Sequence, residues 1–362
     1  LLAFLFSSIN LGLQSLKWPV IVTICSNLLS SIITYLLLLN GFGLASLGLQ
    51  IMINASINLT GQFFVFAYLS RIHKLKPIIN LSNFMTLFGE LSFTFISKLS
   101  SIVINNLDAI IITKVIGPVA SVIYVYSKKS FVYAYDVINQ VIQSFAPRIS
   151  FQSSGDNNDS TNSNVGNLIS IIFFITIIFS SALLVLNEDF VNIWLGKEFY
   201  VGQTSNIYLT ISFFFYVFAM SFLDIIFSLN RIKLSSSFIL VWSISQVSIM
   251  YFLTEEFGFY GAAISMCFSA ILFVHFPLFF KLNFFKLEPN KHLLKLIFKR
   301  LFQIFLVIIS AYVTDFFLAE NWFELLLKGF FNVIASIILL SCTRDFRGGI
   351  KFIIANRKIK NA

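Results

Sequence analysis

The sequence has few charged residues: Asp, Glu, Lys and Arg together make up 11% of its 362 residues. Soluble globular domains carry about 25%, because a chain folded in water needs polar groups over a large surface. So little charge in a chain of this length excludes an ordinary soluble protein.

Cysteine and histidine are equally scarce, with three of each. Cys25, Cys267 and Cys342 lie far apart in apolar stretches, and the histidines are scattered too. Neither pattern has the spacing of a disulfide framework or a metal site. Phosphate-binding glycine loops and nucleophile elbows are also missing. We therefore expect no metal, no cofactor and no catalytic residues.

Apolar residues, by contrast, make up 57% of the chain and form long runs without charge. A helix of about 18 or more such residues can cross the hydrocarbon core of a bilayer, where backbone groups must pair within the helix. The sequence therefore predicts an all-α polytopic membrane protein with about eleven transmembrane helices. We expect them at 1–15 (partial), 18–39, 44–69, 84–112, 118–146, 165–187, 201–228, 234–254, 258–280, 301–318 and 323–342.

Connections rich in basic residues alternate along the chain with connections that have few. Most of the 25 fall on one side of the predicted bundle, including the clusters at 281–300 and 344–362. The other side carries Lys114, Lys197 and Lys328 and most of the acidic loop residues, among them Asp189. The positive-inside rule then places the C-terminus in the cytoplasm. Because this asymmetry accounts for the net charge of +9, nucleic acid is not an expected partner.

A faint internal repeat divides the chain. Leu13–Lys17 resembles Leu229–Lys233, and each segment precedes a helix that ends near a Phe-Gly pair. An even number of helices separates the two copies, which predicts parallel halves. We interpret 1–75 as the C-terminal part of a first six-helix lobe whose beginning is missing from this chain, and 84–280 as the second six-helix lobe.

The remaining segments are predicted from composition. Residues 281–300 read as a basic amphipathic helix on the cytoplasmic surface, and 301–343 as two extra transmembrane helices. Residues 344–362 form a basic cytoplasmic tail. The polar stretch 149–164 is expected to be a flexible linker.

Two predicted helices carry polar stripes. In 84–112, Glu90, Thr94, Ser97, Ser101, Asn105 and Asp108 recur at steps of three or four, beside Lys98. In 118–146, the same spacing joins Tyr126, Lys129, Tyr133, Asp136, Gln140 and Gln143. Such spacing puts each set on one helical face. Lys129 lies about 16 Å of rise into its helix, near the bilayer midplane.

Two interpretations of the stripes stay open. They could line a wet cavity in which lysines attract an anionic substrate. Alternatively, they could pair internally, for example Lys129 with Asp136 or Lys98 with Glu90, and hold the helices together. We expect a structural role for Asp224, and for His275 a hydrogen bond at a helix kink near Pro277. The candidate substrate-binding residues are Lys98, Lys128, Lys129, Tyr126, Tyr133, Asp136, Gln140, Gln143, Asn105 and Asp108.

The stretch from Asn105 through Asp108, Gly117 and Tyr124 to Pro147-Arg148-Ile149-Ser150, with Trp194-Leu195-Gly196 in a predicted outer loop, resembles a known family. It is similar to the polysaccharide (O-antigen type) flippases of the multidrug/oligosaccharidyl-lipid/polysaccharide exporter superfamily. The resemblance implies a two-lobe helical bundle that flips a pyrophosphate-linked oligosaccharide by alternating access. It maps the central basic residues of the family onto Lys128 or Lys129, and onto Lys98.

The leading hypothesis is therefore translocation of an undecaprenyl-pyrophosphate-linked oligosaccharide across the inner (cytoplasmic) membrane, for O-antigen or another surface polysaccharide. The expected partners are this lipid, the bilayer, a coupling ion gradient and polysaccharide polymerase or ligase proteins. Three alternatives remain: an ion-coupled multidrug extruder, a membrane-embedded glycan polymerase or ligase, and a non-transporting helical scaffold.

Overall fold

The computed structural model describes residues 6–7, 9–10, 13, 17–43, 45–72, 81–153, 158–277, 303–304, 306–314 and 319–341. All regular elements within these ranges are helical, in the order α2 (Lys17–Leu39), α3 (Ala45–Ile72), α4 (Leu81–Val115), α5 (Pro118–Ser153), α6 (Asn158–Trp194), α7 (Gln203–Ser228), α8 (Ile232–Phe257), α9 (Phe259–Ala270) and α12 (Trp322–Ser341). A 3-10 helix spans Lys197–Phe199, and a π-helical turn spans Ile271–His275. The chain divides into two compact units, Leu1–Phe84 and Met85–Ala362.

The all-α polytopic architecture is confirmed. Within the described ranges, seven helices are long and apolar enough to cross a membrane: α2, α3, α4, α6, α7, α8 and α12. The predicted span at 118–146 forms α5, which is not among the seven although it is one of the longest helices. Its polar stripe lowers its hydropathy. The predicted span at 258–280 is shorter in the described residues, at Phe259–His275.

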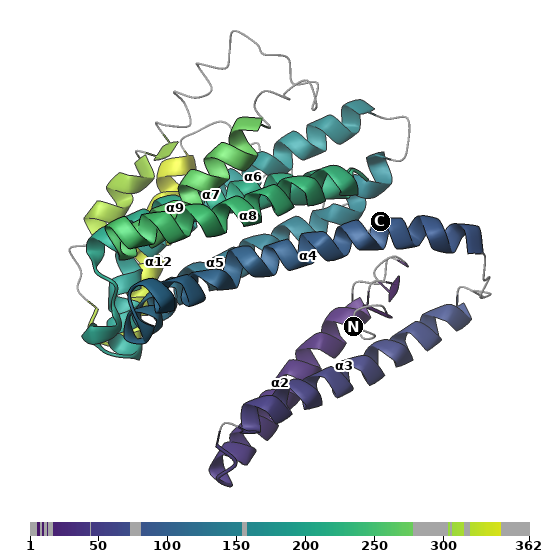
Figure 1. The fold of residues 1–362 in the computed structure, drawn as a ribbon, viewed down its shortest axis with the longest axis horizontal. Coiled ribbons are helices and arrows are strands. Elements are labelled where there is room, and N and C mark those ends of the chain that lie inside the picture. The colour runs from purple at the N-terminus through teal and green to yellow at the C-terminus, as the bar shows by residue number, and fades with distance from the viewer. Residues whose placement is uncertain are drawn as a thin grey trace. The chain divides into compact units, whose positions relative to one another are not determined.

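In the first unit, α2 and α3 lie side by side (Figure 1). The buried residues of α2 are small or polar, namely Pro19, Ser26, Ser30 and Thr34, whereas leucines such as Leu28 and Leu36 are exposed. This is the pattern of helices that pack closely in lipid, where apolar side chains gain nothing by facing each other. Gly61 permits the approach, since a Cβ there would lie 2.5 Å from Val22.

Polar side chains also connect the helices of this unit. Asn54 on α3 donates a hydrogen bond to the Asn27 side chain at 2.7 Å and to Ser30 at 3.1 Å, both on α2. The buried Gln62 donates to the Pro19 carbonyl at 3.1 Å. In the absence of water, such bonds fix which faces of the two helices meet.

The second unit is a bundle in which α5, α6 and α7 pack together and α8 and α9 pack on α7 (Figure 1). Its core contains Ile138 and Ile142 of α5 and Val217 of α7, all fully buried. A buried polar network lies near the end of α6. There Ser130 and Asn206 both bond to Asn187, while the Ser127 hydroxyl bonds to the backbone of Phe199 and Val201 in the connection that follows α6.

The flexible linker expected at 149–164 is wrong for the residues that the structure describes. Residues 149–153 continue α5, and Asn158–Asn164 form the first turns of α6. Ser, Asn and Asp favour the first turns of a helix, where they satisfy free amide groups, so a polar composition does not exclude helix there. Both helices therefore extend well beyond the apolar segments that identified them.

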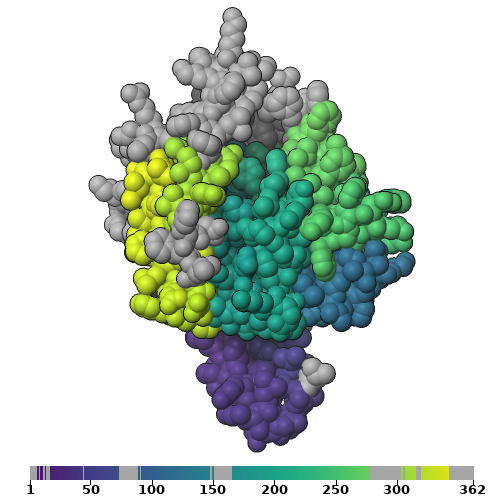
Figure 2. Space-filling view, turned by 90° about the vertical axis from the view of Figure 1, so that its left-hand side faces the viewer, coloured from purple at the N-terminus to yellow at the C-terminus, as the bar shows by residue number. Residues whose placement is uncertain are grey.

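The C-terminal helix α12 is attached to the bundle by polar contacts. Its buried residues Lys328, Asn332 and Ser336 follow one another at four-residue steps along one face. Asn332 bonds to Ser181 of α6 and to Thr314, and Ser336 bonds to Ser310. Figure 2 shows α12, in yellow, against the teal surface of the bundle. The predicted surface helix at 281–300 and the tail at 344–362 lie outside the described residues.

His275 ends the π-helical turn, and its Nε2 atom lies 3.0 Å from the carbonyl oxygen of Phe215 on α7. The hydrogen bond expected for this histidine is therefore confirmed. Gly43 and Gly258, which follow the two Phe-Gly phenylalanines, have φ angles of 50° and 56°, a conformation that glycine adopts without strain. The two turns are alike, although the division of the chain into repeats stays a prediction.

Candidate functional site

A tight turn positions the two polar stripes against each other. The α4 helix ends at Val115 and α5 begins at Pro118, with Gly117 between them at φ 135°. Glycine after a helix end and proline at a helix start are the residues that this geometry favours. Asp108 and Lys128 lie at similar distances along the chain from this turn, and the Ser121 hydroxyl bonds to the Ala109 carbonyl at 2.9 Å. The folding of α4 and α5 into an antiparallel pair thus brings their polar faces together.

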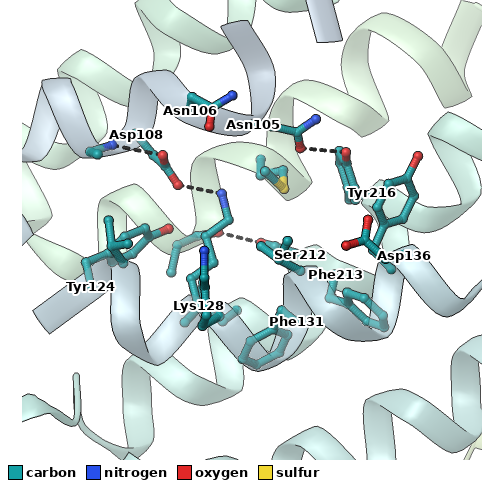
Figure 3. A pocket seen from close by; sticks show the side chains of 18 residues that line it. Asn105, Asn106, Asp108, Tyr124, Lys128, Phe131, Asp136, Ser212, Phe213 and Tyr216 are labelled. Carbon is teal, nitrogen blue, oxygen red and sulfur yellow. Dashed lines mark hydrogen bonds and ion pairs between the residues drawn. The ribbon is translucent and has the colours of Figure 1, made fainter. Parts of the chain in front are cut away.

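Part of each face lines a cavity of about 320 Å³ in the second unit (Figure 3). Helices α4 and α5 supply its polar wall, and α7 and α9 supply the opposite wall. The Ser212 hydroxyl on α7 joins that second wall by bonding to the Ala263 carbonyl on α9 at 2.5 Å. The lining includes Asn105, Asn106 and Asp108 of α4; Tyr124, Lys128, Lys129, Phe131, Tyr135 and Asp136 of α5; Ser212, Phe213 and Tyr216 of α7; and Met266 of α9.

Lys128 forms an ion pair with Asp108. Its Nζ atom lies 2.5 Å from Asp108 Oδ2, and the two side chains are 12% and 8% exposed. The other carboxylate oxygen accepts the Ala109 amide at 2.8 Å. A buried carboxylate needs such partners, because an unpaired charge is costly away from water. Lys128 is thus neutralised within the protein.

Lys129 differs from its neighbour. Among the described residues no carboxylate lies within ion-pair distance of its ammonium group, and the contact that it makes is with the ring of Tyr133, whose centroid is 5.9 Å away. The alternative pairing of Lys129 with Asp136 is therefore not formed. The proposed pairing of Lys98 with Glu90 lies outside the described side chains. Lys129 brings an unneutralised positive charge to the cavity.

Tyrosine and asparagine line the other part of the cavity (Figure 3). The Tyr216 hydroxyl on α7 donates to Asn105 Oδ1 on α4 at 2.7 Å. The ring of Tyr135 packs on that of Tyr216, with centroids 4.9 Å apart. Asp136 follows Tyr135 on α5 and is exposed to the cavity.

The predicted candidates thus separate into two groups. The structure brings Asn105, Asp108, Lys128, Lys129 and Asp136 together around one cavity. Tyr126 packs instead on Trp194 and Phe199, and Tyr133 contacts Lys129 outside the lining. Gln140 and Gln143 are exposed further along α5. Lys98 is exposed on α4, within electrostatic reach of Asp224 on α7.

Several lining residues escaped sequence analysis. Tyr216 and Ser212 lie four residues apart on α7, and this spacing puts both on one helical face. Tyr124 and Tyr135 are off the face that the spacing of α5 defined. The available signal for Tyr135 was its position directly before Asp136, which belongs to the polar stripe.

Within the described residues, no group of three or more His, Cys, Asp or Glu side chains could hold a metal ion. The cavity offers one ammonium group without an ion-pair partner among the described residues, one ion pair, one exposed carboxylate and several hydroxyl and amide groups. This set suits the binding of an anionic group together with neutral polar groups.

Comparison with known proteins places the chain. The family described as polysaccharide biosynthesis protein matches residues 14–202. Among solved structures, the chain is similar to one described as lipid II flippase MurJ in an inward closed conformation, with a TM-score of 0.54 and 19% sequence identity over 94% of this chain and 70% of that chain. Identity at this level supports a common fold. Curated protein sequences give no significant match.

The family match covers more than half of the chain and includes α4, α5 and the polar faces that form the cavity. The similar structure agrees in fold with the polytopic helical bundle described above. The chain belongs to the polysaccharide biosynthesis protein family and has a MurJ-like fold.

Proposed function

We propose that this chain translocates a lipid-linked oligosaccharide, carried on undecaprenyl pyrophosphate, across the cytoplasmic membrane for surface polysaccharide biosynthesis. The observation that carries the proposal is Lys129, an unpaired cation in a membrane-embedded cavity. A charge at this depth is costly and is typical of a substrate pathway. The family match supports the connection to polysaccharides, and the MurJ-like fold supports a lipid-linked cargo.

The mechanism we propose is alternating access between the two lobes, with the pyrophosphate held by Lys129. Phosphate oxygens accept charge-assisted hydrogen bonds from an ammonium group, which are about twice as strong as neutral ones. No bond is made or broken, so the protein acts as a transporter and an ion gradient or the cargo gradient supplies the energy. By the positive-inside rule the C-terminus faces the cytoplasm, and polymerase or ligase proteins use the cargo on the other side. O-antigen is the surface glycan that the resemblance of the sequence favours.

The test replaces Lys129 in the natural producer strain and measures surface polysaccharide. Lys129→Ala removes the cation and is expected to abolish surface polysaccharide, while lipid-linked precursor accumulates in the inner leaflet. Lys129→Arg keeps the charge and should retain part of the activity. Lys197→Ala removes an exposed lysine at the start of the 3-10 helix. It is the matched control and should behave as wild type.

The same strains separate the alternatives. If the chain were a polymerase or ligase, an inactive variant would leave unpolymerised precursor in the outer leaflet instead of the inner one. A multidrug extruder would change drug susceptibility and leave the polysaccharide intact. Normal polysaccharide in a Lys129→Ala strain whose membrane contains a wild-type amount of the protein would reject the proposal.

A further inference from the structure

The cavity has two ends of different charge. Lys128 and Asp108 lie at one end, and Asp136, Tyr216 and Asn105 lie at the other (Figure 3). Lys129 follows Lys128 in α5 and also lines the cavity. Lys129 and Asp136 are seven residues apart on α5, or about 10.5 Å of helix rise. The ion pair cancels the charges of Lys128 and Asp108, which leaves Lys129 and Asp136 as the unneutralised charges of the lining.

Asp136 makes no ion pair among the described residues, and its exposed side chain lines the cavity. Asp108 shows the contrast: that carboxylate is buried and receives both a lysine and a backbone amide. A carboxylate that packing does not need and that faces a binding cavity is available to a ligand.

A free carboxylate in a cavity that binds an anion requires explanation, because like charges repel and weaken the binding. The repulsion is offset if the carboxylate accepts hydrogen bonds from the ligand, since bonds to a charged acceptor are the strong ones. In a pyrophosphate-linked sugar, the groups that can donate are the hydroxyls of the sugar. The rise of about 10.5 Å between positions 129 and 136 leaves space along α5 for a phosphate group and the adjoining sugar.

The neighbours of Asp136 suit a sugar as well. Tyr216 and Asn105 present a hydroxyl and an amide, already held in place by their 2.7 Å hydrogen bond. The half-buried ring of Tyr135, which packs on Tyr216, offers apolar surface for the carbon-bound hydrogens of a pyranose. The cavity volume of about 320 Å³ is at the low end of the range of about 300–1,000 Å³ for small-molecule sites. A cavity of this size fits one sugar beside the pyrophosphate and not a whole oligosaccharide.

We propose that Asp136 is a specificity-determining residue that binds hydroxyl groups of the sugar attached directly to the pyrophosphate. The inference rests on the proposed function, because it takes Lys129 as the residue that binds the pyrophosphate. The two charges then fix the direction of the headgroup along α5, with phosphate at Lys129 and sugar at Asp136. A lipid pyrophosphate without a sugar would bind through Lys129 alone.

The experiment measures the affinity of the purified full chain, in lipid nanodiscs, for two probes. One is undecaprenyl pyrophosphate, and the other is the lipid-linked oligosaccharide extracted from the producer strain. Asp136→Asn keeps the size of the side chain and removes its charge. We expect this variant to bind the oligosaccharide lipid about tenfold more weakly than wild type, and to bind undecaprenyl pyrophosphate as well as or better than wild type.

Two further variants make the result specific. Lys129→Ala should weaken the binding of both probes, and Glu256→Gln, which neutralises an exposed carboxylate at the end of α8, should weaken neither. An equal effect of Asp136→Asn on both probes, or no effect on either, overturns the role of Asp136 while leaving the proposed function intact. A wild-type chain that binds neither probe, or a Lys129→Ala chain that binds both normally, overturns the proposed function itself.

Discussion

Lys328 on α12 donates a hydrogen bond from its ammonium nitrogen to Asp189 Oδ2 on α6, at 2.7 Å. The lysine side chain is 3% exposed and the aspartate side chain 12%. Both residues had been placed on the same, outer side of the membrane from the distribution of charge along the sequence, and their contact agrees with that placement. The pair attaches the last described helix to the core of the second unit.

Replacing one partner of this ion pair is expected to destabilise the protein more than replacing both. Lys328→Met leaves Asp189 as an uncompensated buried charge, which costs about 3–5 kcal/mol. The double variant Lys328→Met/Asp189→Leu replaces both charges with apolar groups and should recover most of the loss. Thermal unfolding of the detergent-solubilised protein measures the difference. Equal melting temperatures for the single variant and wild type would contradict a buried ion pair.

The Lys128–Asp108 pair gives a second prediction, with opposite effects on stability and binding. Asp108→Asn removes the charge that neutralises Lys128 and leaves a buried ammonium group with a weaker partner, so the melting temperature should fall. The same change frees a second cation at the cavity, so inorganic pyrophosphate should bind several-fold more tightly than to wild type.

Calorimetric titration with inorganic pyrophosphate would measure that affinity, and Glu255→Gln, at the exposed end of α8, is the control for a change in net charge. A variant that binds pyrophosphate no more tightly than wild type would show that Lys128 does not reach the ligand.

Chemical labelling should distinguish the wet face of α5 from its packed face. In a chain without native cysteines, a cysteine at position 129, 132 or 136 is expected to react with a water-soluble maleimide, because these positions line the cavity. A cysteine in place of Ile138 should not react, since Ile138 is 0% exposed. Mass spectrometry of the labelled protein gives the extent of reaction at each site. Labelling of position 138 alone would reverse the assignment of the two faces.

The close packing of α8 and α9 predicts a severe effect of one added methyl group. A Cβ at Gly261 would lie 1.7 Å from the Leu253 carbonyl oxygen, so the two helices would have to move apart. We expect Gly261→Ala to lower stability by about 1–3 kcal/mol or more. Gly166→Ala is the matched control: it lies in α6 with nothing within 4 Å of its Cβ position, and should be neutral or stabilising by about 0.4–1 kcal/mol.

Melting temperatures of the two glycine variants, measured side by side in the same detergent, test the packing. A Gly261→Ala protein as stable as the Gly166→Ala protein would show that α8 and α9 are farther apart than the structure has them.

The sequence was sufficient for most of the helices and for some of the residues in one wall of the cavity. Long apolar runs located α2, α3 and α6 to α8, because in lipid the backbone leaves few alternatives to helix. The three- and four-residue spacing located the polar faces of α4 and α5, since that spacing alone decides which side chains share a face. Gly117 and Pro118 form the turn at which the two helices meet.

Pairing between helices could not be read in the same way. Lys128 and Lys129 are adjacent and identical in type, and only the position of Asp108 across the α4–α5 contact separates the neutralised lysine from the unpaired one. The contribution of Tyr216 depends on which face of α7 turns inward, and the polar residues of α7, such as Asn206 and Ser212, do not by themselves identify that face. The ends of α5 and α6 were missed because polar residues suit a helix outside the membrane as well as a loop.

The π-helical turn at Ile271–His275 accommodates one more residue than an α-helical turn would, and each residue of an α-helix turns the chain by about 100°. The side chains after the turn therefore point in directions that a continuous α-helix would have given to their neighbours. Deleting one residue within the turn would rotate Phe276 and Pro277 onto a different side of the helix and withdraw the imidazole from Phe215. The directions of the side chains after the turn are thus set separately from those of the side chains before it.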